Sequence, residues 1–160
     1  MTILSQIESK IVSLPDAVEL VSKWKADGQK VVFTNGCFDV LHYGHVCYLA
    51  DAKELGDKLV VGLNSDASVR RLKGETRPIN GQKERATLLA ALNFIDAVVV
   101  FDEDTPENLI KNIRPDFLVK GGDYTFETIV GADFVSSYGG SVKTIPLVEN
   151  FSTTNILKRL

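Results

Sequence analysis

Two kinds of hydrophobic pattern alternate along the chain. Short, nearly continuous runs of Val, Ile, Leu and Phe are typical of strands buried on both faces. Between them lie stretches in which apolar residues recur every three or four positions, as in amphipathic helices. The runs predict strands at 31–34, 59–64, 97–101, 117–119 and 142–145. The periodic stretches predict helices at 15–26, 45–55, 67–72, 82–92, 106–113, 128–137 and 153–160.

Strands that alternate with helices predict an α/β fold with a doubly wound, Rossmann-like parallel sheet. The crossovers between its strands are expected to be right-handed, with helices on both faces. We expect an N-terminal helical extension over residues 1–28 and a single α/β domain over residues 29–160. In such folds ligands bind beyond the carboxyl ends of the strands, so the loops that follow strands should carry the chemistry.

Composition and charge narrow the class of protein. A chain of 160 residues fits one domain with its own core. Its hydrophobic fraction of 44% and charged fraction of 24% are typical of soluble globular proteins, and neither a bilayer-spanning run nor a secretory signal is present. We therefore expect a cytoplasmic protein without a membrane partner. The net charge of −3 argues against nucleic acid as a partner. Cys37 and Cys47 are spaced neither as a redox pair nor as zinc ligands, so reduced thiols are expected.

Both histidines of the chain fall between the first strand and the next helix, in the segment TNGCFDVLHYGH. The spacing of His42 and His45 places both imidazoles on one side of a first helical turn, where free N–H groups favour an anion. Gly44 leaves room for a phosphate, and imidazoles can stabilise oxygens that gain charge in a transition state. The alternative is a pair of histidines bonded only to backbone at the helix start. A metal site is disfavoured because no third ligand accompanies them.

This segment resembles the signature of the HxGH nucleotidyltransferases, which transfer a nucleoside monophosphate to a phosphorylated small molecule and release pyrophosphate. The resemblance implies that His42 and His45 contact the triphosphate and stabilise its α-phosphate without a covalent enzyme intermediate. It implies that Asp39 buttresses the loop at the substrate site. It also implies nucleotide contacts by Thr34, Asn35, Gly36, Phe38 and Gly44.

Two cations stand out in SVRRLKGETRPINGQKER, a segment otherwise typical of a solvated surface loop. Arg85 shares a helix face with Leu88, Leu89 and Leu92, so it lies at the core edge or points into the site. The HxGH family has a Lys in this loop and an Arg in this helix. The resemblance therefore implies a catalytic role at the phosphates for Lys73 and a nucleotide-binding role for Arg85.

Two later segments complete the predicted site. KGGDY follows the strand at 117–119, and its glycines allow the backbone to approach a ligand. FSTTNIL opens the last helix with three successive hydroxyl residues, which suit an anion. The resemblance implies substrate contacts by Lys120, Gly122 and Asp123, of which Asp123 is the one candidate metal ligand. It implies contacts to the β- and γ-phosphates by Ser152, Thr153 and Thr154.

The combination of FTNGCFDVLHYGH, RLKGETRPI, EDTPENLI, PDFLVKGGDY and FSTTNIL is similar to the heptose-1-phosphate adenylyltransferases of lipopolysaccharide-precursor synthesis. This resemblance implies that the chain uses ATP, D-glycero-β-D-manno-heptose 1-phosphate and Mg²⁺, forms ADP-heptose and pyrophosphate, and assembles as a homodimer. Because one helix precedes the domain, we expect a separate kinase to supply the sugar phosphate.

Two other functions stay open at this point. A glycerol-3-phosphate cytidylyltransferase is the first, but PLVENF replaces the basic stretch that such enzymes have before the last helix, which disfavours CTP. A non-catalytic nucleotide-binding sensor is the second, and the presence of both histidines with Lys73 disfavours it. A dehydrogenase is disfavoured because no GxGxxG follows the first strand.

Overall fold

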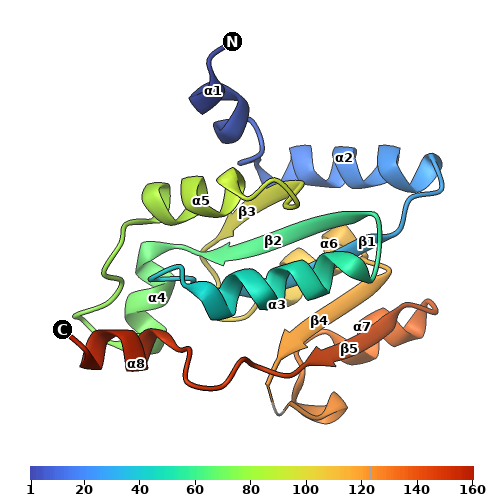
Figure 1. Ribbon diagram of the computed structural model, residues 1–160. Helices are drawn as coiled ribbons and strands as arrows, with labels where there is room; N and C mark the ends of the chain where they lie inside the picture. The colour runs from blue at the N-terminus through green and yellow to red at the C-terminus, as the bar shows by residue number, and fades with distance from the viewer. Residues whose placement is uncertain (123) are drawn as a thin grey trace.

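A five-stranded parallel sheet forms the centre of the protein (Figure 1). The computed structural model describes residues 1–122 and 124–160. The strand order is β3-β2-β1-β4-β5, and every pairing is parallel. All five predicted strands are present, and the predicted doubly wound α/β fold is confirmed. The strands are β1 (Val31–Gly36), β2 (Lys58–Asn64), β3 (Ala97–Phe101), β4 (Phe117–Gly121) and β5 (Ser141–Ile145).

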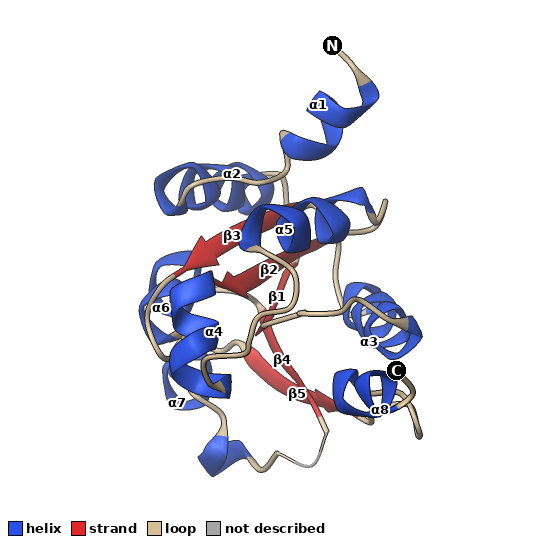
Figure 2. Ribbon diagram, turned by 90° about the vertical axis from the view of Figure 1, so that its left-hand side faces the viewer, coloured by secondary structure: helices blue, strands red, loops and turns tan. Residues whose placement is uncertain are grey.

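Helices cover both faces of this sheet. Figure 2 shows α6 and α7 on one side of the strands and α3 on the other. The first face is covered by α2 (Leu14–Ala26), α6 (Glu107–Ile113) and α7 (Ala132–Ser137), and the second by α3 (Tyr43–Glu54) and α5 (Gln82–Ala91). The short helices α4 (Asp66–Lys73) and α8 (Thr153–Lys158) lie toward the end of the sheet to which the strand arrows point (Figure 1).

Each face of the sheet has its own hydrophobic core. Side chains of successive strand residues point to opposite faces, so Val31 and Phe33 join one core and Val32 joins the other. All three side chains are fully buried. Burial on both faces explains why the strands are nearly continuous apolar runs.

The N-terminal region contributes to this core. The short helix α1 (Ile3–Glu8), which the hydrophobic pattern did not predict, begins after Thr2, whose side chain accepts a hydrogen bond from the Ser5 backbone. In α2, Ala17 and Val21 are buried against the sheet, although they belong to the segment assigned to an extension from the sequence. No helix in the described ranges 1–122 and 124–160 is long and apolar enough to cross a membrane.

The chain reverses its direction of travel across the sheet between β3 and β4. The order places β2 and β3 on one side of β1, and β4 and β5 on the other. Beyond the carboxyl ends of β1 and β4 the connections leave in opposite directions, which opens a crevice. One boundary near it differs from the sequence prediction. The helix predicted at 128–137 begins only at Ala132, because Gly131 has a φ of +87°, and a 3-10 turn, η1 (Phe126–Thr128), precedes it.

Candidate active site

A cavity of about 690 Å³ lies at the carboxyl ends of the strands, where the fold predicts a ligand site. Its wall combines the loop after β1, the end of α4, β4 and the start of α8. The structure thus brings together nine of the residues predicted from the sequence. They are Asn35, Gly36, Phe38, Asp39, His45, Lys73, Lys120, Thr153 and Thr154.

A smaller recess of about 160 Å³ adjoins this cavity. His45 and Thr153 line both spaces and so mark the boundary between them. The recess also contains three more predicted residues, His42, Gly44 and Ser152. Its remaining wall is mainly apolar and is formed by Tyr48, Leu147, Val148 and Phe151.

The loop after β1 has a tightly constrained backbone. A Cβ atom at Gly36 would lie 2.9 Å from Cε2 of Phe38, so only glycine fits there without a shift. Phe38 itself has a φ of 44°, in the left-handed region that non-glycine residues seldom adopt. This conformation sets the Phe38 ring edge-on to His45, with ring centroids 5.1 Å apart. The loop therefore holds the His45 imidazole from one side.

The two histidines stack on each other at the start of α3. Their ring centroids are 3.7 Å apart with an interplanar angle of 22°. Burial lowers the pKa of His42, and burial together with the neighbouring His42 lowers the pKa of His45 to about 4. Both rings are therefore neutral at pH 7.

Neutral rings at this position can act as hydrogen-bond donors. The backbone N–H of His42 donates to Nδ1 of His45 over 3.3 Å. A neutral imidazole whose Nδ1 accepts carries its proton on Nε2, so His45 can donate from Nε2 to a ligand. Nδ1 of His42 and Oδ1 of Asn35 are buried and have no hydrogen-bond partner among the described residues. Such orphaned atoms indicate a place where a ligand completes the hydrogen bonding.

Gly44 allows the segment before α8 to approach the histidines. A Cβ atom at this position would lie 3.0 Å from Cε1 of His42 and 3.0 Å from Cβ of Phe151. The Phe151 ring packs edge-on against Tyr43, with ring centroids 5.1 Å apart. The recess therefore depends on the absence of a side chain at Gly44.

Cations line the larger cavity. Lys73 ends α4, and Lys120 is the last residue but one of β4, with a half-buried side chain whose pKa is lowered by that burial. Neither forms an ion pair with another described residue. Burial raises the pKa of the Cys37 thiol between them, and Lys73, Arg85 and Arg77 oppose that rise electrostatically. This part of the cavity therefore favours an anion.

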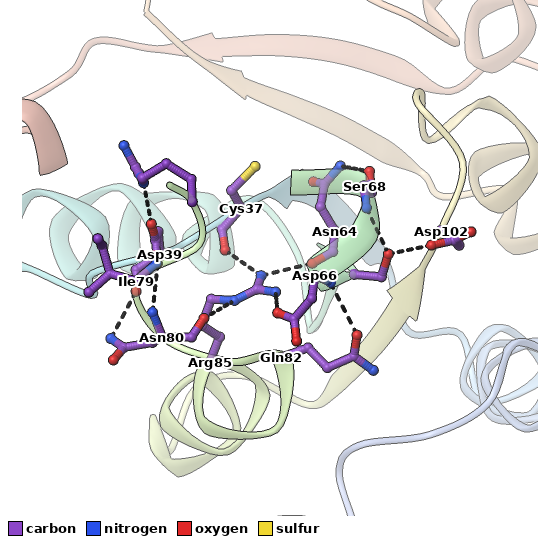
Figure 3. A network of polar contacts seen from close by, with 12 residues as sticks. Cys37, Asp39, Asn64, Asp66, Ser68, Ile79, Asn80, Gln82, Arg85 and Asp102 are labelled. Atoms are coloured by element: carbon purple, nitrogen blue, oxygen red, sulfur yellow. Dashed lines mark hydrogen bonds and ion pairs between the residues drawn. The ribbon is translucent and has the colours of Figure 1, made fainter. Parts of the chain in front are cut away.

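Arg85 does not reach the cavity, contrary to its predicted nucleotide-binding role. Its side chain is 0% exposed. Figure 3 shows its guanidinium directed at Cys37, Asn64, Asp66 and Asn80. Nε donates to the Asn80 carbonyl over 3.0 Å, Nη1 donates to the Cys37 and Asn64 carbonyls over 2.8 Å each, and Nη2 pairs with the Asp66 carboxylate at 2.8 Å. The structure therefore places Arg85 beneath the loop after β1 as a support.

Asp39 fastens the loop 74–81 to the loop after β1. Its carboxylate accepts from the backbone N–H groups of Ile79 at 2.7 Å and Asn80 at 3.0 Å (Figure 3). It also accepts from Nε of Arg77. Burial alone would raise the pKa of Asp39, but hydrogen bonds from Asn80, Arg77 and Ile79 hold it below its usual value. Asp39 is thus a charged buttress whose oxygens are already engaged by the protein.

Two further predicted residues, Thr34 and Gly122, line neither space. The Thr34 hydroxyl lies 2.6 Å from the Tyr48 hydroxyl, which donates to the Val119 carbonyl over 3.2 Å, so it ties strands together below the cavity. Gly122 supplies a turn with a φ of +92° and is absent from the lining. Asp123 lies outside the described residues. Among those that are described, no group of three His, Cys, Asp or Glu side chains could hold a metal ion.

One wall of the cavity and one of its cations were not predicted from the sequence. The wall follows β3 and continues into the segment around η1, and it could have been found from the rule that loops after strands carry ligands. The cation, Arg77, was included among the surface charges of its loop. The missed lining residues are Cys37, Asn64, Leu72, Arg77, Asp104, Thr105, Pro106, Tyr124, Thr128 and Val130.

Comparison with known proteins identifies the family of the chain. The cytidylyltransferase-like family model matches residues 33–159. The chain is 58% identical to the bifunctional protein HldE of Geobacter sulfurreducens over 153 residues, which are 96% of this chain and 31% of that protein. It is 62% identical to the bifunctional protein HldE of Syntrophotalea carbinolica over 148 residues, or 92% of this chain and 30% of that protein. The chain thus spans less than a third of the length of these relatives.

Solved structures agree with this result. A lipopolysaccharide core biosynthesis protein from Thermoplasma volcanium matches with a TM-score of 0.60 and 30% identity, over 76% of this chain and 98% of that one. A pantoate-beta-alanine ligase from Francisella tularensis matches with a TM-score of 0.62 over 94% of this chain and 78% of that one, and at 13% identity it supports the fold alone. The chain therefore belongs to the cytidylyltransferase-like family and is a nucleotidyltransferase.

Proposed function

We propose that this nucleotidyltransferase transfers AMP from ATP to D-glycero-β-D-manno-heptose 1-phosphate in the cytoplasm, giving ADP-heptose and pyrophosphate. The observation that carries the proposal is the division of the site into a cation-lined cavity and a mainly apolar recess, joined at His45 and Thr153. A nucleotide is divided in the same way, into charged phosphates and a flat, largely apolar base. The resemblance to heptose-1-phosphate adenylyltransferases supports the choice of sugar.

The recess suits adenine. Leu147, Val148 and Phe151 provide apolar cover for the faces of a base, and the backbone of this segment can pair with the N6 amine and N1. The recess lining contains no Lys or Arg among the described residues. Because a site that fits the polar edge of one base leaves polar groups unpaired with another, discrimination against CTP is expected.

The two histidines suit stabilisation of the reacting phosphate. In the proposed reaction a phosphate oxygen of the sugar phosphate attacks the α-phosphorus of ATP, and the bond from that phosphorus to pyrophosphate breaks. The attacking oxygen is already ionised, so no general base is needed. Nε2 of His45 can donate to an oxygen that gains charge, and the stacked His42 fixes the orientation of the His45 ring. Lys73 adds a positive charge at the phosphates.

The remaining wall of the cavity suits a phosphorylated sugar. Lys120 offers the ammonium group of a half-buried side chain for a phosphate, while Thr105 and Thr128 offer hydroxyl groups and Tyr124 offers an aromatic face. The Asp104 carboxylate on the same wall pairs with Arg71 at 2.9 Å. This mixture of hydroxyl, aromatic and charged groups matches a polyhydroxylated acceptor better than a purely apolar one.

Mg²⁺ is part of the proposal as a partner of the nucleotide. In this proposal the ion is bound chiefly through substrate phosphates and water. When bound, Mg²⁺ neutralises charge on the phosphates. The protein residues then have to orient the two substrates and exclude water. The homodimer expected from the resemblance is tested by light scattering.

The test is pyrophosphate release from a matrix of two nucleotides and several acceptors. We expect rapid release only with ATP and heptose 1-phosphate in the presence of Mg²⁺. Turnover with CTP and glycerol 3-phosphate would replace the proposal with the cytidylyltransferase alternative. Nucleotide binding without pyrophosphate release from any pair would instead support the sensor.

A further inference from the structure

Arg77 and Arg85 both bond to the loop after β1, but they differ in how many of their guanidinium nitrogens the protein engages. Arg85 has every nitrogen of its guanidinium engaged by protein acceptors, and its side chain is 0% exposed. Arg77 uses only Nε, which donates to the Asp39 carboxylate. A guanidinium has five N–H donors in a fixed planar fork, so the terminal Nη groups of Arg77 keep their donors free of described protein acceptors.

Arg77 is one of the residues that line the cavity. Its side chain is 19% exposed, and Arg77 lines the same space as His45, Lys73 and Lys120. It also lies close enough to Cys37 to act on the charge of that thiol, as does Lys73. A partly buried guanidinium beside other cations can donate two hydrogen bonds to two oxygens of one phosphate.

Asp39 fixes the direction of this fork. The Asp39 side chain is 1% exposed, and two backbone N–H groups hold its carboxylate in addition to Arg77. Asn80 closes the arrangement by donating from its side chain to the Asp39 carbonyl over 2.9 Å. An arginine side chain loses considerable rotamer freedom on binding a ligand, and a pre-formed ion pair removes most of that cost before the ligand arrives.

We propose that Arg77 is a phosphate-binding residue of this cavity and that Asp39 is its positioning residue. The inference rests on the proposed function only in that phosphorylated substrates enter the cavity. The phosphate that Arg77 meets comes either from the nucleotide or from the acceptor, and both present the same chemistry to the fork. Arg85 holds the loop after β1 from below and lines neither space.

The test compares Arg77→Gln with Arg70→Gln. Arg70 is exposed on α4 and lines neither space, so its replacement removes the same charge from the same region without touching the site. Calorimetry first measures Kd for α,β-methylene-ATP, which cannot release pyrophosphate. It then measures Kd for inorganic phosphate added to the complex with this analogue, as a probe for the acceptor phosphate that does not depend on the attached alcohol.

We expect Arg77→Gln to raise one of these two dissociation constants by about 10- to 100-fold, as for loss of a charge-assisted hydrogen bond. Weaker binding of the ATP analogue would assign Arg77 to the nucleotide. Weaker binding of inorganic phosphate with unchanged binding of the analogue would assign it to the acceptor. If both dissociation constants change by less than about twofold, as in Arg70→Gln, the proposal is overturned. Neither arm needs turnover, so a wrong acceptor in the proposed function leaves this test intact.

Asp39→Asn tests the positioning role. The amide preserves the shape of the carboxylate but weakens its hold on the Arg77 guanidinium. We expect Asp39→Asn to weaken the same ligand as Arg77→Gln, and to have little further effect on binding in the Arg77→Gln background. A purely structural Asp39 would lower Tm in both backgrounds and change binding additively, which would refute the positioning role. Arg77→Lys keeps the charge and serves as the folding control, with its Tm expected near that of the wild type.

Discussion

Replacement of Arg85 by Met tests whether this residue supports the fold or binds nucleotide. The change removes a side chain that is 0% exposed while keeping an unbranched stem. It strips the Asp66 carboxylate of its ion pair and leaves the carbonyls of Cys37, Asn64 and Asn80 without their donor. We therefore expect a large loss of stability.

The magnitude follows from the burial of the pair. Removing one partner of a buried ion pair costs about 3–5 kcal/mol. The Asp66 side chain is 35% exposed, so water can hydrate it in the variant and the loss should fall toward the lower value. For a domain of this size each kcal/mol lowers Tm by roughly 2–4 °C, so a loss near the lower value should lower Tm by roughly 6–12 °C.

The assay is thermal unfolding followed by circular dichroism, paired with Kd for α,β-methylene-ATP well below Tm. Arg71→Met is the matched control, because the Arg71 side chain is 45% exposed and its ion pair with Asp104 is open to solvent, so its loss should change Tm little. A variant of Arg85 that melts like the wild type but binds the analogue much more weakly would refute the supporting role. It would restore the nucleotide contact predicted from the sequence.

Three further predictions concern the site itself. His45→Ala should lower kcat by ~10²- to 10³-fold with little change in Tm, because it removes one donor to a developing charge; wild-type turnover would contradict this. Lys73→Ala should lower kcat/KM for ATP while Tm stays within about 1 °C, since an exposed cation contributes little to the core; unchanged kinetics would return Lys73 to the solvated surface. The pKa of His45, lowered from 6.5 to about 4 in the folded protein, means that the unfolded chain binds more protons between these values. The free energy of unfolding should therefore be highest above about pH 6.5 and fall as the pH drops toward 4. The loss from His45 is at most about 3 kcal/mol, or roughly 1–2 kcal/mol once solvent screening of the partly exposed ring is included. An equal slope of Tm against pH in the His45→Gln variant would show that His45 does not cause the loss.

The strands and most helices could be predicted because burial requires a recognisable pattern of apolar residues in the sequence. A strand covered on both faces must be apolar throughout, as β2 is, and a helix on the sheet must repeat its apolar residues, as α5 does. Helix α1 has no such trace, since six residues with no buried member give little periodicity. Its position depends on contact with α5, which only the folded chain provides.

The histidine pair could be predicted because its signal is local. His42 and His45 lie three positions apart in one helical turn, so their proximity follows from helix geometry alone. The role of Arg85 could not be predicted in this way. Periodicity places it on the inner face of α5, but its carbonyl acceptors come from two separate loops and from the end of β2.

Arg77 escaped prediction for the same reason. Its partner Asp39 is 38 positions away in the sequence, and nothing in the loop GETRPIN distinguishes a fixed arginine from a solvated one. The wall that follows β3 is a milder case. The strand-end rule indicates its position, but small polar residues such as Thr105 carry no specific signal for a ligand.

The central claim is the choice of ATP and heptose 1-phosphate, and one competition experiment tests it directly. The protein is incubated with Mg²⁺, equal concentrations of ATP and CTP, and equal concentrations of heptose 1-phosphate and glycerol 3-phosphate, and the products are identified by intact mass. We expect ADP-heptose to form together with an equal amount of pyrophosphate. A cytidine product, or an adenosine product carried by glycerol, would contradict the account.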